Sequence, residues 1–60
     1  MDIFRAGVYV VIHGLQNSPQ YNGCRGRITG VYDTKYTVNL LDENEQIKVK
    51  KSNLQRQSPP

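Results

Sequence analysis

Basic side chains at alternate positions are the chemically most informative feature of this 60-residue chain. Arg25 and Arg27 are separated by one residue, and so are Lys48 and Lys50. In extended strands alternate residues point to the same face, and neighbouring strands lie ~4.8 Å apart. We therefore predict an outward basic stripe, interpreted first as an ordinary solvated sheet face, with contact to consecutive phosphates as the alternative. The predicted basic stripe is Arg25, Arg27, Thr37, Lys48 and Lys50.

Tyrosines dominate the aromatic residues, with four tyrosines and one phenylalanine in the sequence. A basic surface with exposed aromatic rings can stack single-stranded bases. Tyrosines that line a shallow groove can equally bind a partner peptide at low entropic cost. Tyr36 shares the parity of Val38, which predicts a structural role for this ring. The predicted partner-binding residues are Tyr9, Tyr21, Asn22 and Tyr32.

The remaining reactive side chains do not form a catalytic or metal-binding pattern. His13 is the only histidine and Cys24 the only cysteine, so a metal-ligand cluster cannot be assembled within one chain. A nucleophilic Cys–His pair would need a third group to orient it, and the parity of Cys24 points inward. The acidic residues in 42–45 have a spacing that matches no calcium loop. We therefore predict that the chain is not an enzyme and has no catalytic residue, metal or cofactor.

Composition narrows the class of protein further. Eight Lys and Arg against five Asp and Glu give a net charge of +3, which favours a polyanion only where the basic groups cluster. The longest strongly apolar run, residues 8–12, is far shorter than the ~20 residues that span a membrane, so we expect no membrane association. A single cysteine excludes an internal disulfide and predicts an intracellular location, in the cytoplasm or nucleus. A surface groove is expected rather than a deep pocket, because so short a chain buries only ~60% of its unfolded surface.

The first half of the chain predicts two strands joined by a long loop. Residues 8–13 are rich in β-branched and aromatic side chains, which indicates a strand. Residues 15–23 are polar and turn-rich and form the predicted long loop. Residues 24–32 alternate again and contain Gly26 and Gly30, which favours a strongly curved second strand.

The second half predicts a hairpin, a further strand and a short helical turn. Residues 36–40 alternate cleanly after a turn at 33–35, and residues 46–50 alternate after the acidic turn. Residues 52–54 indicate a single 3-10 turn before a short last strand. The predicted core is Val8, Val10, Ile12, Leu15, Ile28, Val38, Leu40, Ile47, Val49 and Leu54.

These elements predict one small all-β domain. Five short strands are too few for a two-sheet sandwich, whereas one bent sheet that curls over a core fits the length. We predict a small, partly open barrel over residues 7–56. Residues 1–6 are expected to be an N-terminal extension and residues 57–60 a flexible tail.

Three motifs in this order resemble the small Src-homology-3-like (SH3-like) barrel modules of the KOW type over roughly residues 6–55. They are Gly7-Val8-x-Val10-x-x-x-Gly14-Leu15, Tyr21-Asn22-Gly23-x-x-Gly26-x-Ile28-x-Gly30 and Ile47-x-Val49-x-x-x-Asn53-Leu54. The resemblance implies a five-stranded SH3-like barrel with a short 3-10 turn before the last strand. Modules of this group bind proteins or nucleic acids. Recognition of proline-rich peptides is not expected, because the chain has no tryptophan and lacks the acidic loop of that groove.

The leading hypothesis for the function is a non-catalytic binding module. It would dock a protein or peptide partner through the long loop around Tyr21 and the adjacent strand edge. One alternative is a KOW-like module that binds RNA or DNA through the basic stripe. Another is a structural module that self-associates through an unpaired strand edge. The sequence leaves the identity of the ligand and the oligomeric state open.

Overall fold

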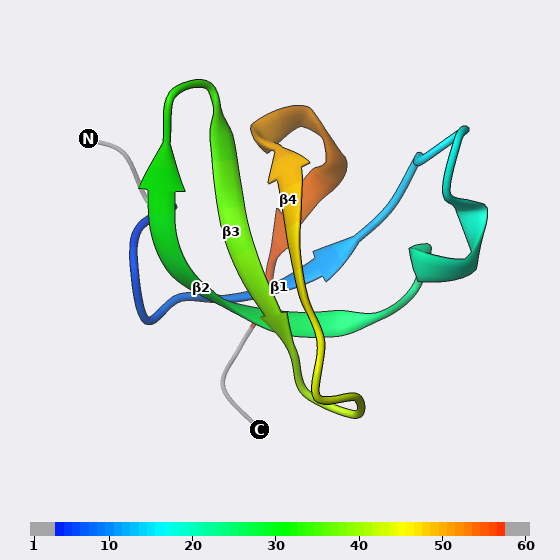
Figure 1. Cartoon of the computed structure of the whole chain (residues 1–60), viewed down its shortest axis with the longest axis horizontal. Helices are drawn as coiled ribbons and strands as arrows, with labels where there is room; N and C mark the ends of the chain where they lie inside the picture. The colour runs from blue at the N-terminus through cyan, green and yellow to red at the C-terminus, as the bar shows by residue number, and fades with distance from the viewer. Residues whose placement is uncertain (1–3, 58–60) are drawn as a thin grey trace.

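Figure 1 shows a computed structural model of the chain, which describes residues 4–57. The strands are β1 (Tyr9–Ile12), β2 (Arg25–Tyr32), β3 (Lys35–Leu40), β4 (Gln46–Lys50) and β5 (Leu54–Arg56), and the 3-10 turns are η1 (Pro19–Tyr21) and η2 (Lys51–Asn53). The predicted fold class is confirmed: the described residues are all-β, with five strands and a 3-10 turn directly before the last one. No helix in this part of the chain is long and apolar enough to cross a membrane.

Alternation of apolar and polar residues explains where the strands form. In β3 the side chains of Tyr36, Val38 and Leu40 are buried, and the residues between them are exposed or half-buried. β1 consists of apolar and aromatic residues, buries Val10 and Ile12, and leaves Tyr9 and Val11 half-buried. Because strand side chains alternate between two faces, each strand gives one apolar face to the core. The predicted structural role of Tyr36 is confirmed by its burial.

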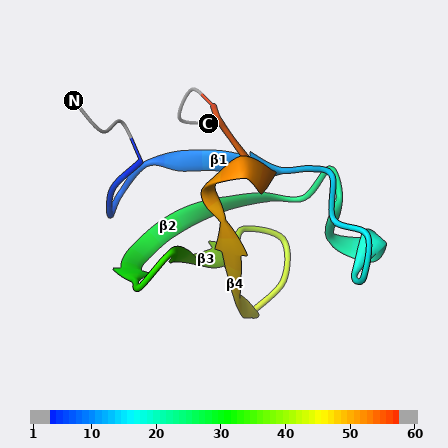
Figure 2. The ribbon, with the colours of Figure 1, turned by 90° about the horizontal axis from the view of Figure 1, so that it is seen from above.

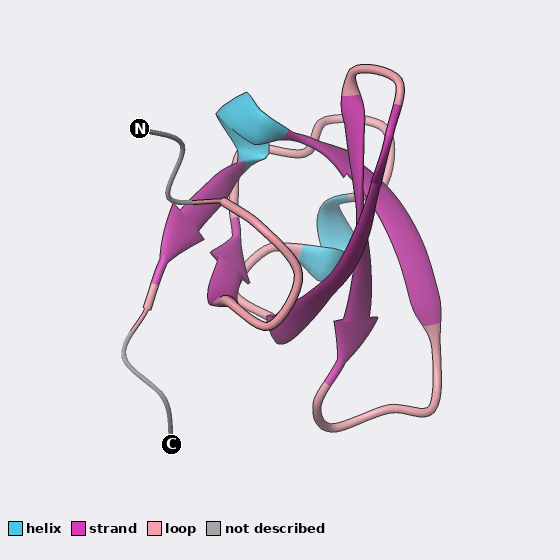
Figure 3. Cartoon of the chain, turned by 90° about the vertical axis from the view of Figure 1, so that its left-hand side faces the viewer, coloured by secondary structure: helices cyan, strands magenta, loops and turns pink. Residues whose placement is uncertain are grey.

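The five strands form one antiparallel sheet in the order β4-β3-β2-β1-β5. β2 is the longest strand and pairs with β1 near its start and with β3 along most of its length. The sheet curls, so that the strands surround a common interior (Figures 2 and 3). β4 and β5 are the outer strands, and within residues 4–57 they do not pair with each other. The sheet is therefore strongly bent and remains open between β4 and β5.

Two features of β2 explain the bend. A Cβ atom at Gly26 would overlap Val38 Cγ1 and would lie 3.0 Å from the main-chain oxygen of Asn39, so β2 and β3 approach this closely only at a glycine. The register between β2 and β3 also shifts between Ile28 and Gly30. Such a bulge increases the local twist and bends the strand. The predicted curvature of this strand is confirmed (Figure 1).

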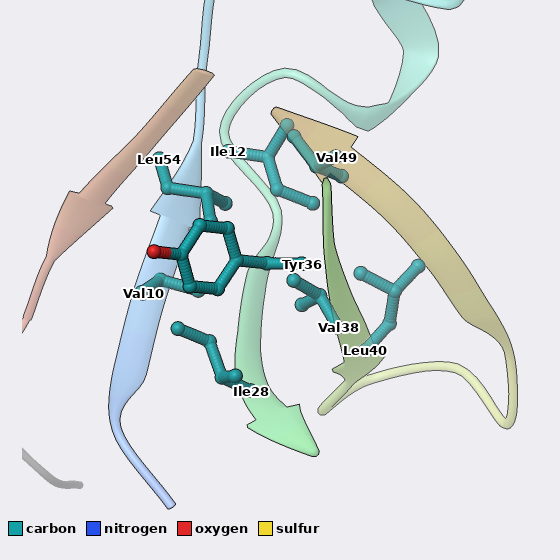
Figure 4. Close-up of a cluster of buried hydrophobic side chains, with 8 residues drawn as sticks. All are labelled: Val10, Ile12, Ile28, Tyr36, Val38, Leu40, Val49 and Leu54. Carbon is teal, nitrogen blue, oxygen red and sulfur yellow. The ribbon is translucent and has the colours of Figure 1, made fainter. Parts of the chain in front are cut away.

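The hydrophobic core receives side chains from every strand (Figure 4). Its buried members are Val10, Ile12, Ile28, Tyr36, Val38, Leu40, Val49 and Leu54. Three residues predicted for the core, Val8, Leu15 and Ile47, are only half-buried and pack against its margin. This differs from the prediction because a single curled sheet covers the core incompletely. Leu15 and Ile47 instead line a hollow beside β4.

The described ends of the chain contact the sheet. Phe4, in the predicted N-terminal extension, packs edge-on against Tyr36 with 6.1 Å between ring centroids. At the other end the Gln57 N–H donates to the main-chain oxygen of Tyr9 (2.8 Å). The rest of the predicted extension and tail includes residues 1–3 and 58–60, which lie outside the described residues.

Candidate functional site

The long loop between β1 and β2 is shaped by its own hydrogen bonds. The side-chain amide of Asn22 accepts from the Leu15 N–H (2.8 Å) and donates to the Leu15 main-chain oxygen (3.0 Å). Between these residues the chain forms η1, which the sequence did not predict and which has a proline at its start. The Cys24 N–H donates to the Tyr21 main-chain oxygen (3.0 Å) and returns the chain to β2. The loop therefore has a defined shape before any ligand binds.

Two contacts hold the long loop beside β4. The Tyr21 hydroxyl donates to Glu45 Oε2 (2.5 Å), and Glu45 directly precedes β4. The Asn53 side-chain amide donates to the His13 main-chain oxygen (2.9 Å), and the His13 N–H donates to the Asn53 main-chain oxygen (2.9 Å). Asn53 lies in η2, directly after β4. The loop is thus attached to the sheet just before and just after this outer strand.

Between the two attachments lies an open groove of about 470 Å³. The loop forms one wall through residues 14–18 and Tyr21, and β4 forms the other through residues 47–50. Lys35 of β3 and Asn53 of η2 complete the lining. We call this hollow the β4 groove. The long loop and the outer strand β4 therefore face each other across this groove.

The lining of the β4 groove combines apolar and basic side chains. Leu15, Ile47 and Tyr21 are half-buried and pack against the core, so their remaining apolar surface faces the groove. The cations of the lining are Lys35, Lys48 and Lys50, all exposed, and no carboxylate is among the lining residues that the structure describes. Glu45 lies nearby, but its carboxylate accepts the hydrogen bond from Tyr21. The groove is therefore suited to a ligand that is partly apolar and partly acidic.

The residues of the predicted basic stripe are exposed, apart from the half-buried Thr37, but they do not form one row. In the sheet register Thr37 lies opposite Lys48, whereas Arg27 lies opposite Asn39. Asn39 is itself opposite Gln46 on β4. Arg25 and Arg27 therefore lie on β2, and the two stripe lysines lie two strands away at the sheet edge. The neutral side chains of Asn39 and Gln46 continue the row of Arg27, so neither lysine lies in that row.

Each basic group has a tyrosine beside it. The Arg27 guanidinium lies over the Tyr9 ring, with 5.5 Å to its centroid. The Lys48 ammonium lies over the Tyr32 ring at 4.9 Å. Both distances are within the range of cation–π attraction. Tyr9 of β1, Arg27 of β2 and Asn39 of β3 line a second hollow, and the exposed Tyr32 lines a third.

Of the four predicted partner-binding residues, only Tyr21 lines the β4 groove. Tyr9 and Tyr32 lie elsewhere, and Asn22 uses its amide inside the loop. Sequence reasoning missed Lys35 as a lining residue. It lies opposite Lys50 in the β3–β4 register, and no signal in the sequence shows which of the exposed lysines border the loop.

The two reactive side chains named from the sequence differ in their exposure. His13 is exposed at the start of the long loop, whereas Cys24 is half-buried against the core. The Cys24 thiol points to the main-chain oxygen of Gln20 (3.8 Å). Within residues 4–57 no three His, Cys, Asp or Glu side chains are placed to hold a metal ion.

Comparison with known proteins adds no relative: no family model matches this chain, and neither a curated protein nor a solved structure matches it. The functional inference therefore depends on the geometry of the β4 groove and on the charges around it.

Proposed function

We propose that this chain is a non-catalytic binding module of the SH3-like, KOW-like type that docks a protein partner in the β4 groove. The observation that carries the proposal is the groove itself, whose loop wall is attached on both sides of β4 by Tyr21–Glu45 and His13–Asn53 contacts. A preformed wall lowers the ordering cost of binding. The volume of about 470 Å³ suits a short linear segment of a partner rather than a folded surface.

The composition of the groove supports docking rather than catalysis. Binding surfaces in proteins commonly have an apolar centre with a polar rim. Here Leu15, Ile47 and Tyr21 supply the apolar part and lysines supply the rim. Among residues 4–57 the lining includes no histidine, cysteine or carboxylate, three common sources of nucleophilic and acid–base chemistry.

The test begins with linear peptides selected from a random display library against the purified protein. On isotope-labelled protein, titration of a selected peptide is expected to shift the amide signals of Leu15, Tyr21 and Ile47. Leu15→Gln is expected to weaken binding about tenfold, because a polar amide would replace half-buried apolar contact area. Val31→Thr is the matched control, since Val31 is 56% exposed and lines none of the three hollows.

Two outcomes would contradict the docking proposal. One is a set of shifts that leaves the long loop and β4 unchanged. The other is equal loss of binding in Leu15→Gln and Val31→Thr while both variants remain folded. Either result would place the partner elsewhere on the molecule.

A second candidate function, binding of RNA or DNA, is favoured by the hollow beside β2. Tyr9 offers a ring, Arg27 a cation and Asn39 an amide in this hollow. Single-stranded nucleic acid commonly binds to such a mixture of aromatic and basic groups. A mixed single-stranded oligonucleotide is then expected to bind with a log–log salt slope near −0.7 per phosphate contact. Arg27→Gln should reduce that slope, and salt-independent or absent binding would remove this candidate.

A further inference from the structure

The outer edge of β4 carries main-chain groups that the sheet does not use. The Leu40 N–H donates to the main-chain oxygen of Glu45 (2.9 Å), so these two opposite residues are a hydrogen-bonded pair that continues the β3–β4 ladder. Hydrogen-bonded and non-hydrogen-bonded pairs alternate along an antiparallel ladder. Ile47 and Val49 therefore bond to β3, and the alternate residues direct their main-chain groups away from it. These alternate residues are Gln46, Lys48 and Lys50.

No other described segment takes up these groups. β4 is the outermost strand on its side of the sheet. Within residues 4–57, no loop hydrogen-bonds to the N–H groups of Gln46, Lys48 and Lys50 or to the carbonyls of Gln46 and Lys48. The long loop contacts the chain just before and just after β4, and the groove separates loop from strand in between. The edge is therefore accessible to an added strand.

We propose that the partner adds to this sheet as a short strand along the outer edge of β4, and that this strand alternates acidic with apolar residues. This inference rests on the docking function proposed above and specifies its partner. Strand addition is a common way for domains to bind extended peptides: main-chain bonds supply affinity, and pockets for alternate side chains supply specificity.

The side chains on the two faces of β4 define the alternation. Lys48 and Lys50 are exposed on the outward face, and Lys35 lies opposite Lys50 on β3. Ile47 is half-buried on the inward face, where Leu15 of the loop also lines the groove. Directly opposite side chains in paired strands contact one another, and opposite charges attract. Acidic residues of the added strand would therefore meet the lysines, and the apolar residues between them would enter the groove.

The same charges disfavour a second copy of this chain as the occupant. Two β4 strands paired edge to edge would bring lysines close to lysines, and like charges opposite each other are destabilising. Lysines on an edge strand are also a recognised protection against self-pairing. An acidic partner removes this repulsion. The charge of the edge thus selects the partner's chemistry.

The test uses a pool of synthetic peptides, each about eight residues long to span β4, that alternate Asp or Glu with Val, Ile or Tyr. In the complex the amides of Gln46, Lys48 and Lys50 are expected to exchange with solvent at least about tenfold more slowly. The amides of Ile47 and Val49 should change little, because they are already bonded to β3. Protection restricted to alternate residues is the signature of strand addition, and equal or absent protection would overturn it.

A second measurement examines the peptide backbone. Methylating one peptide nitrogen at a time should weaken binding by about three- to tenfold at every second position, where an N–H donates to β4. The positions between should tolerate methylation. A loss without this two-residue period would contradict strand addition.

A third measurement examines the charge preference. Lys50→Glu should weaken binding of the pool about three- to tenfold, because an attraction becomes a repulsion. Arg56→Glu is the matched control: it changes the net charge equally, lies exposed on β5 and is outside the groove. Equal effects of the two variants would reduce the preference to net charge and overturn the inference.

Failure of strand addition can be distinguished from failure of docking. If library-selected peptides shift Leu15 and Ile47 without protecting the Lys48 amide, the docking function is supported and strand addition is wrong. If the alternating pool does not bind while library-selected peptides do, strand addition is again wrong. If neither binds, both proposals are wrong. A concentration-dependent mass with the same protected amides would identify a second copy as the occupant and overturn the acidic-partner inference.

Discussion

Among single residues, Tyr21 makes the contact that places the long loop beside β4. Its hydroxyl donates to Glu45 at the residue before β4. This hydrogen bond raises the pKa of Tyr21 above the usual 10.0, and the negative charges of Glu45 and Glu43 raise it further. Loss of the phenolic proton would replace a hydrogen bond with a repulsion between two anions. The loop attachment is therefore a property of the protonated tyrosine.

The first prediction concerns the titration of this ring. Tyr21 should titrate above pH 10.0 in carbon-13 NMR of labelled tyrosines, and Glu45→Ala should lower its pKa. Because the folded-state pKa is raised, the stabilising contribution is complete below the unfolded pKa and is lost as pH rises through the folded value. Asp42→Ala is the control from the same turn. An unchanged titration in Glu45→Ala would show that the contact is absent in solution.

The second prediction concerns the glycine at the closest approach of β2 and β3. Gly26→Ala should lower the free energy of unfolding by about 1–3 kcal/mol, because the new Cβ would overlap Val38 and crowd Asn39. Gly30→Ala is the matched control in the same strand, since a Cβ there has no atom within 4 Å. It should change the free energy by less than about 0.5 kcal/mol. Urea unfolding measures both, and equal losses would contradict the close approach.

Among the elements, the strands could be predicted because apolar and polar side chains alternate along consecutive residues. The patterns of β3 and β4 predict both strands, and the burial of Tyr36 follows from its parity with Val38. The alternation also indicated that Lys48 and Lys50 are exposed. It could not show that Arg27 and Lys48 lie in different rows, because the register and the bulge in β2 decide their spacing.

The position of the long loop could not be predicted, because long-range contacts determine it. Tyr21 and Glu45 are 24 residues apart, and Asn53 and His13 are 40 apart. No local pattern links such positions. The groove and its lining by Leu15 are therefore visible only in the folded chain, and the same contacts explain why this residue is half-buried at the margin of the core.

The third prediction concerns the internal bonds of the loop. Asn22→Ala removes both hydrogen bonds to the Leu15 backbone, each worth about 1 kcal/mol. The Leu15 amide should then exchange about tenfold faster, and peptide binding in the groove should weaken because the wall is no longer preformed. Asn44→Ala, in the exposed turn before β4, is the control. Unchanged exchange at Leu15 in Asn22→Ala would show that the loop is held by other contacts.

For the whole molecule, one core supports both walls of the groove. All five strands contribute buried side chains, and Leu15, Tyr21 and Ile47 pack against the margin of the same cluster. The charged groups are distributed differently: among residues 4–57 no polar or charged residue is buried, and the lysines are exposed. The net charge of +3 therefore describes the surface of the molecule, whereas the shape of the groove depends on how the core side chains pack.

The fourth prediction follows from this shared core. Ile12→Val removes one methylene from a fully buried side chain and should cost about 0.5–1.5 kcal/mol. That is about one sixth of the roughly 3–9 kcal/mol expected for a domain of this length. Far-UV circular dichroism and tyrosine fluorescence should report the same lowered urea midpoint with an unchanged slope, because the loop and the strands share one cluster. Leu41→Ala is the control, since Leu41 is 40% exposed. Separate unfolding transitions from the two probes would show that the loop unfolds independently of the core.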